Sequence, residues 1–296
     1  MAKTGRYTMC KAMERIEARG ERKNLLATAK RMLMVALAIS FAVCAEGAET
    51  PTAGKDAAPD RVAGPANGPA VPAPRTDWAG GAYCHLMNEM SRAVRGQDFD
   101  LVVFGDSITM GWIYPETDKS WPGGREVWQR HFGHLKTANF GVSGDRTEHV
   151  LWRIENAGQA DGWTAKTIVL AIGENNHGQV RTGWTTNDTP SGAASGTKAI
   201  LDAILARHPE SRIVLIGLLP RPGKDGDGHV WMRKYNAELA KLAGGRVSFH
   251  DISARFLSES GRQAAGLFRD GVHPLPAGYE VYAQELNRIL KEINRH

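Results

Sequence analysis

The chain has 296 residues, of which 42% are apolar and 23% charged, the ordinary mix of a soluble globular protein. Its net charge of +5 is unevenly spread, because residues 1–45 hold nine of the 37 Lys and Arg but only three of the 32 Asp and Glu. The rest of the chain carries 28 basic and 29 acidic residues, so the basic character belongs to the N-terminus and no nucleic-acid partner is expected.

The first predicted element is an N-terminal leader, residues 1–45. Lys30 and Arg31 precede a largely apolar run of 14 residues, Met32–Ala45, which ends in small side chains. This pattern is typical of a secretory signal peptide, and the run is shorter than the roughly 20 residues that a membrane span needs. We therefore expect a secreted or periplasmic protein with no stable membrane span in the mature chain.

Three features of the leader leave alternatives open. Translation starting at Met13 or Met32 would shorten the basic region, and the apolar run is also compatible with an uncleaved anchor. Cys44 is a candidate lipid-attachment site, although the residues before it match a lipobox poorly. Of the three cysteines only Cys84 lies beyond the leader, so the mature chain is expected to fold without an intramolecular disulfide.

Residues 46–77 are rich in Ala, Pro and Gly and are predicted to form a flexible linker. A folded domain is expected over residues 78–296. Short apolar, β-branched runs alternate with helical patterns along it. The predicted strands are 101–104, 137–142, 167–172, 212–218 and 247–250, and the helical apolar stripes lie within 150–154, 200–205, 231–242 and 279–293. This alternation predicts an α/β fold, a three-layer doubly wound sandwich around a mostly parallel five-stranded sheet.

The first strand runs into Gly105-Asp-Ser107, which is the point where a serine hydroxyl would project from the sheet edge. Its backbone N–H would lie at a helix N-terminus, directed at developing negative charge. Ser107 is therefore the candidate nucleophile. The alternative is that Ser107 only caps the helix, a role that serine often has.

The candidate base for this serine is His273, which follows Asp270 by three residues in the last loop before the final helix. In a turn, this spacing brings a carboxylate to the Nδ1–H of the imidazole and leaves Nε2 to accept the serine proton. A surface Asp–His pair is the alternative interpretation. His250 at a strand end is the main rival base, and His177 is a candidate for substrate contact.

Donors for an oxyanion are expected where the next two strands end. Gly144 follows the second strand and offers a backbone N–H, whereas Asn175 follows the third strand and offers a side-chain amide. Each residue alone is also compatible with a simple turn or loop cap. Together, three consecutive strands end in residues suited to acyl transfer, at the edge where a parallel sheet forms its ligand crevice.

These motifs resemble the four sequence blocks of the SGNH (GDSL-like) hydrolases, which have a flavodoxin-like fold. The matching blocks are Gly105-Asp-Ser107, Gly144, Gly173-Glu-Asn175 and Asp270-Gly-Val-His273. The resemblance implies that Ser107 is the nucleophile, that Gly144 and Asn175 donate to the oxyanion, and that Asp270 and His273 form the acid–base pair. Residues 139–153 and 216–221 also resemble the catalytic α subunits of the intracellular platelet-activating-factor acetylhydrolases.

Two departures from those subunits bear on the substrate. Ser143 stands where they usually have Gly, and the segment 178–196, which contains Trp184, is longer than theirs and is expected to rim the site. We expect an exported serine esterase that hydrolyses short acyl esters, first acetyl esters on carbohydrates, without a metal or other cofactor. The alternatives are a lipid or phospholipid acylhydrolase, an acyltransferase, and a non-catalytic binding protein on the same fold. The oligomeric state is not predicted.

Overall fold

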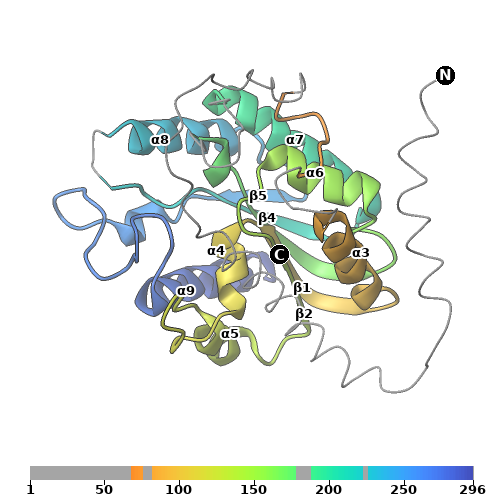
Figure 1. Cartoon of the computed structure of the whole chain (residues 1–296), viewed down its shortest axis with the longest axis horizontal. Helices are drawn as coiled ribbons and strands as arrows, with labels where there is room; N and C mark the ends of the chain where they lie inside the picture. Colours follow the sequence, from red (N-terminus) through yellow and green to blue (C-terminus); the bar gives the residue numbers. More distant parts are fainter. Residues whose placement is uncertain (1–67, 76–81, 178–187, 223–225, 296) are drawn as a thin grey trace, which may run out of the picture. The chain divides into compact units, whose positions relative to one another are not determined.

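A computed structural model describes residues 68–75, 82–177, 188–222 and 226–295 of the chain (Figure 1). All of these residues lie within one of the chain's two structural units, Asp60–His296. The predicted leader, residues 1–45, lies outside the described residues, as does the linker up to residue 67.

The domain is built on a five-stranded sheet in the order β2-β1-β3-β4-β5, and all four strand pairings are parallel. The strands are β1 (Asp98–Gly105), β2 (Thr137–Gly141), β3 (Thr164–Ala171), β4 (Arg212–Ile216) and β5 (Val247–His250). β2 is added on one side of β1, and β3, β4 and β5 are added on the other side. The strand order therefore reverses between β1 and β3. A parallel sheet places its ligand crevice beyond the carboxyl ends of the strands at such a point.

Helices cover both faces of the sheet, giving the three layers predicted from the sequence (Figure 1). Alternate residues of β1 face opposite sides: Val102 and Phe104 pack into one core cluster, and Leu101 and Val103 into the other. The first cluster is covered by α3 (Ala82–Val94), α6 (Thr147–Asn156), α7 (Pro190–Arg207) and α8 (Asp227–Ala240). The second is covered by α5 (Arg125–Phe132) and α9 (Pro276–Ile293).

The strand boundaries differ from the predicted ones for local reasons. β1 begins three residues earlier than expected, because Asp98 and Phe99 already pair with Thr164 and Ala165 of β3. β4 ends at Ile216 and not at residue 218, because the N–H of Leu218 donates to the side chain of Asn236 at 2.8 Å. α3 and α5 lie at 82–94 and 125–132, where no helix was predicted.

Part of the predicted linker packs against the domain. The N–H of Ala73 donates to the carbonyl of Glu148 at 3.2 Å, and the carbonyl of Pro69 accepts from the hydroxyl of Thr147 at 3.1 Å. Ala73 is buried. We name residues 68–75, which belong to the predicted linker and contact α6 in this way, the strap.

Candidate active site

Ser107 lies directly beyond the carboxyl end of β1, as the first residue of the short helix α4 (Ser107–Met110). Asp106 is the cap of this helix, since its carboxylate accepts from the N–H of Ile108 at 3.0 Å. Asp106, and not Ser107, is therefore the cap of this helix. Burial raises the pKa of Asp106 to about 8. Ser107 itself is only 4% exposed.

The side chains of Ser107, His273 and Asp270, which were predicted to act together, form a chain of hydrogen bonds. Ser107 Oγ is 2.9 Å from His273 Nε2, and His273 Nδ1 is 2.8 Å from Asp270 Oδ2. The second carboxylate oxygen of Asp270 accepts from the backbone N–H groups of Val272 at 3.1 Å and His273 at 2.9 Å. These bonds hold the carboxylate against the loop, and they fix the face that it presents to the imidazole.

The loop that carries the pair is itself rigidly closed. Gly271 adopts a φ of +81°, a left-handed conformation that glycine takes without strain, and the N–H of Arg269 donates to the carbonyl of His273 at 2.9 Å. Pro276 begins α9 three residues after His273, where the fixed φ of proline suits the first turn of a helix.

His273 and Asp270 both have shifted pKa values. Burial lowers the pKa of His273 below its usual value; the Asp270 carboxylate opposes this shift, and the cations Arg269 and Arg221 add to it. Partial burial acts to raise the pKa of Asp270, but the hydrogen bonds from His273 and Arg269 hold it well below its usual range. The imidazole is therefore neutral, and the carboxylate an anion, near neutral pH.

Two residues that the sequence analysis did not single out complete this side of the site. Arg269 donates to Asp270 at 3.0 Å and to the carbonyl of Ser120 at 2.7 Å, and its guanidinium lies 3.9 Å from the ring centre of Trp121. The Trp121 ring meets the His273 ring edge to face at 4.6 Å. The adjacency of Arg269 to Asp270 was visible in the sequence, whereas nothing in the sequence linked Trp121 to a loop some 150 residues away.

Gly144 occupies a tight turn after β2. The N–H of Asp145 donates to the carbonyl of Val142 at 3.1 Å, and Gly144 at the third position has a φ of +80°. The turn begins beside the end of β1, because the N–H of Val142 donates to the carbonyl of Gly105 at 3.1 Å. Across the described parts of the chain, no backbone carbonyl accepts a hydrogen bond from the N–H of Gly144.

Asn175 lies in the short helix η3 (Glu174–Asn176) after β3, and its side-chain amide donates to the carbonyl of Asp145 at 2.9 Å. The two residues predicted to hold an oxyanion therefore meet through Asp145. Burial raises the pKa of the Asp145 carboxyl to about 6, and the guanidinium groups of Arg153 and Arg75 oppose this rise, so the carboxylate is ionised at neutral pH. Arg153 pairs with it at 3.0 Å.

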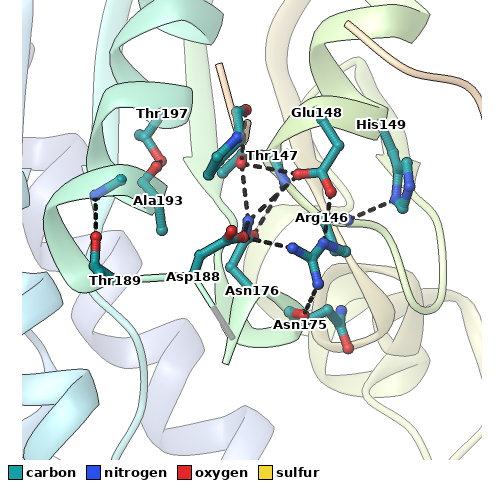
Figure 2. A network of polar contacts seen from close by, with 12 residues as sticks. Arg146, Thr147, Glu148, His149, Asn175, Asn176, Asp188, Thr189, Ala193 and Thr197 are labelled. Atoms are coloured by element: carbon teal, nitrogen blue, oxygen red, sulfur yellow. Dashed lines mark hydrogen bonds and ion pairs between the residues drawn. The ribbon is translucent and has the colours of Figure 1, made fainter. Parts of the chain in front are cut away.

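A polar network at the start of α6 holds the Asn175 loop in place (Figure 2). Arg146 donates to the carbonyl of Asn175 at 3.4 Å and pairs with Glu148 at 2.6 Å. The N–H of Thr147 donates to the side chain of Asn176 at 3.1 Å. Figure 2 shows the Arg146 guanidinium lying between this helix and the Asn175 loop, so α6 and η3 are joined by charge-assisted bonds.

His250 and His177 are the remaining candidates from the sequence. His250 ends β5, where the charges of Arg288 and Glu292 in α9 act on its pKa, which burial lowers. The His177 ring packs 5.2 Å from that of Trp231. Residues 178–187, with Trp184, lie outside the described residues, so the predicted rim is described only from Asp188 onward.

The described residues bear on metal binding and on membrane insertion. Within these ranges, no group of three or more His, Cys, Asp or Glu side chains is arranged to hold a metal ion. Among the helices of the same ranges, none combines the length and the apolar character that crossing a membrane requires.

Comparison with known proteins supplies the family. Residues 103–281, more than half of the chain, match the model of the GDSL-like Lipase/Acylhydrolase family. The chain belongs to this family. As a GDSL-like acylhydrolase it is a carboxylic ester hydrolase, as the sequence analysis predicted.

Relatives of this GDSL-like protein include subunits of platelet-activating factor acetylhydrolase IB. The alpha2 subunit of Rattus norvegicus is 32% identical over 176 residues, which cover 57% of this chain and 70% of that protein. The alpha1 subunit of Homo sapiens is 29% identical over 232 residues, which cover 77% of this chain and 92% of that protein. The crystal structure of an acetyl xylan esterase, AlAXEase, is 16% identical with a TM-score of 0.52, covering 63% of this chain and 97% of that chain, and shows the shared fold.

Proposed function

We propose that this GDSL-like hydrolase cleaves short-chain acyl esters, with acetyl the preferred acyl group, through an acyl-enzyme formed on Ser107. One observation supports this most directly: Ser107 Oγ lies 2.9 Å from His273 Nε2, and the other nitrogen of the ring lies 2.8 Å from Asp270. A serine hydroxyl is a weak nucleophile, and this relay is the arrangement that activates it.

In the first half of the reaction, Ser107 Oγ attacks the ester carbonyl while His273 Nε2 accepts its proton. Asp270 stabilises the imidazolium that forms. The N–H groups of Ser107 and Gly144 and the amide of Asn175 bind the carbonyl oxygen as it becomes negative. The tetrahedral intermediate then breaks its bond to the alcohol oxygen, to which His273 returns the proton.

The second half repeats these steps with water. His273 accepts a proton from a water molecule as that water attacks the acyl carbon, and the tetrahedral intermediate again places its charge on the same three donors. Its collapse breaks the bond to Ser107 Oγ, which regains its proton from His273, and a carboxylic acid is released. No step calls for a metal or another cofactor.

The acyl preference is supported by the relatives, which are acetylhydrolases by name. A carbohydrate alcohol is proposed because the leader predicts export. A phospholipid ester is the second candidate, favoured by the name platelet-activating factor in the relatives.

A substrate panel with the purified full chain tests this function. Acetate release from p-nitrophenyl acetate and acetylated xylan is compared with hydrolysis of p-nitrophenyl octanoate and of a phospholipid carrying an sn-2 acetyl group. Ser107→Ala is expected to lose at least 1000-fold in kcat/KM, whereas Ser195→Ala, an exposed serine of α7, is expected to match the wild type. Full activity in Ser107→Ala would overturn the assignment. Octanoate preferred over acetate would overturn the acyl preference, and acyl transfer to added alcohols in place of hydrolysis would favour an acyltransferase.

We also propose that the chain is exported, on the strength of the basic and apolar pattern in residues 1–45. The N-terminus of the protein recovered from a bacterial periplasm or medium is expected at residue 46 or 49. Recovery of the intact chain from the cytoplasm alone would contradict export, and acylation at Cys44 would favour a lipoprotein.

A further inference from the structure

The strap carries Arg75 to the turn that holds Gly144. Its Nη1 donates to the carbonyl of Ser143 and lies 3.5 Å from the carboxylate of Asp145. The Arg75 side chain is only 6% exposed. A cation is buried at this depth only when its partners compensate for lost hydration, so the contact is a specific one.

The carbonyl of Ser143 and the N–H of Gly144 are the two ends of one peptide group. A trans peptide is planar, and its C=O and N–H point in opposite directions. A donor that holds the carbonyl therefore also sets the direction of the N–H. A guanidinium bound to the carbonyl polarises the peptide as well, which makes the N–H a stronger donor.

The peptide between Ser143 and Gly144 can adopt two orientations in a turn of this kind. With Gly144 at φ +80°, the turn over residues 142–145 has the φ of a type II turn at its third position. Type I and type II turns differ chiefly by a half-rotation of their central peptide, and glycine tolerates both. In the type I form, the Ser143 carbonyl would leave Arg75, and the Gly144 N–H would point the opposite way.

We propose that Arg75 is a positioning residue for ester hydrolysis, which holds the 143–144 peptide so that the Gly144 N–H is directed at the oxyanion. This inference rests on the proposed function, because it assigns a support to one of the donors named there. It also gives the strap a role in catalysis, although the strap lies outside the residues that match the family model, 103–281.

The surroundings of Arg75 hold it against the turn. A Cβ added to Gly144 would lie 2.6 Å from Nη1, so the guanidinium packs directly on the glycine. Asp145 binds Arg75 on one side and Arg153 on the other, and its backbone carbonyl accepts the amide of Asn175 at 2.9 Å. The guanidinium therefore contacts the turn at the point where the two predicted oxyanion donors converge.

The test compares Arg75→Ala and Arg75→Lys in the full chain, with p-nitrophenyl acetate as substrate. Loss of one oxyanion donor costs about 100- to 1000-fold in rate. A donor that is present but free to rotate is expected to cost less, about 10- to 100-fold in kcat, with KM within threefold of the wild type. Lysine offers one ammonium for two partners, so Arg75→Lys is expected to lose about 3- to 10-fold. Arg207→Ala, which removes a more exposed arginine, is the control.

Guanidinium ion added at a millimolar, non-denaturing concentration is expected to raise the kcat of Arg75→Ala at least fivefold. The kcat of Arg207→Ala is expected to stay unchanged. A general loss of structure would not respond in this way. If kcat in both Arg75 variants stays within twofold of the wild type, or if only KM changes, or if guanidinium restores nothing, the inference is overturned. If Arg75→Ala does not fold, unchanged kcat in Arg75→Lys overturns it. A wild-type chain without esterase activity would instead overturn the proposed function.

Discussion

Asp270→Asn removes one charge from the predicted relay and keeps the shape of the side chain. In the wild type, one carboxylate oxygen of Asp270 accepts two backbone N–H groups, those of Val272 and His273, and the other faces His273 Nδ1 at 2.8 Å. The amide of asparagine has a single acceptor oxygen, and the two backbone donors hold it. Its NH₂ group would then face Nδ1, favour the proton on Nε2, and leave Ser107 without a base.

The size of the loss follows from the same distances. Two unit charges about 4 Å apart interact by about 4 kcal/mol at an effective dielectric constant of about 20. The Asp270 side chain is 41% exposed, and solvent screening lowers this to about 2–4 kcal/mol for the imidazolium formed during the reaction. Since each 1.36 kcal/mol is tenfold in rate, kcat/KM should fall about 30- to 1000-fold.

The assay is hydrolysis of p-nitrophenyl acetate at pH 8, with urea unfolding measured in parallel. Asp161→Asn is the matched control, because that exposed carboxylate pairs with Arg207 at the surface and its replacement should leave kcat/KM unchanged. A folded Asp270→Asn protein with kcat/KM within threefold of the wild type would refute the relay.

Three further predictions concern pH and stability. Burial lowers the pKa of His273, and the base must be neutral to act. As the pH is lowered, kcat/KM should therefore fall only below about pH 6.5. A fall centred above pH 7 would contradict this. Arg153→Met leaves a buried carboxylate short of one partner and should lower the free energy of unfolding in urea by about 3–5 kcal/mol, against less than about 1 kcal/mol for the surface pair lost in Arg207→Met; equal effects would be inconsistent with the buried pair. Gly173→Ala adds a Cβ 2.4 Å from a buried tyrosine hydroxyl at φ +117°, and should cost about 2–4 kcal/mol, whereas Gly96→Ala, at φ +73° with open space, should cost about 1–2 kcal/mol; thermal unfolding that ranks them the other way would contradict the steric account.

The fold was predictable because its signal is local. Runs such as Ile213–Ile216 are apolar on both faces, as strands buried between two helical layers are, and all five predicted strands are present in the parallel sheet. The helices left unassigned are different. α5 has only eight residues, so its pattern is too short to separate from a loop in the sequence, whereas α3 has 13 residues and was missed despite its length.

The site was predictable in outline because a parallel sheet brings strand ends together. Ser107, Gly144 and Asn175 each follow a strand, so topology alone predicts that they meet at one edge. The supporting residues escaped prediction because their partners are distant along the chain. Trp121 meets His273 across more than 150 residues, and Arg75 lies in a stretch whose composition is that of a linker.

The most direct test of the central claim is covalent labelling of the full chain with a fluorophosphonate, followed by mass mapping of the modified peptide. We predict one phosphonyl group per chain on Ser107, no labelling in Ser107→Ala, and labelling slowed at least 100-fold in His273→Ala, because the hydroxyl then lacks its base. Labelling on any other residue, or undiminished labelling of Ser107 in folded His273→Ala, would contradict an acyl-enzyme mechanism built on this pair.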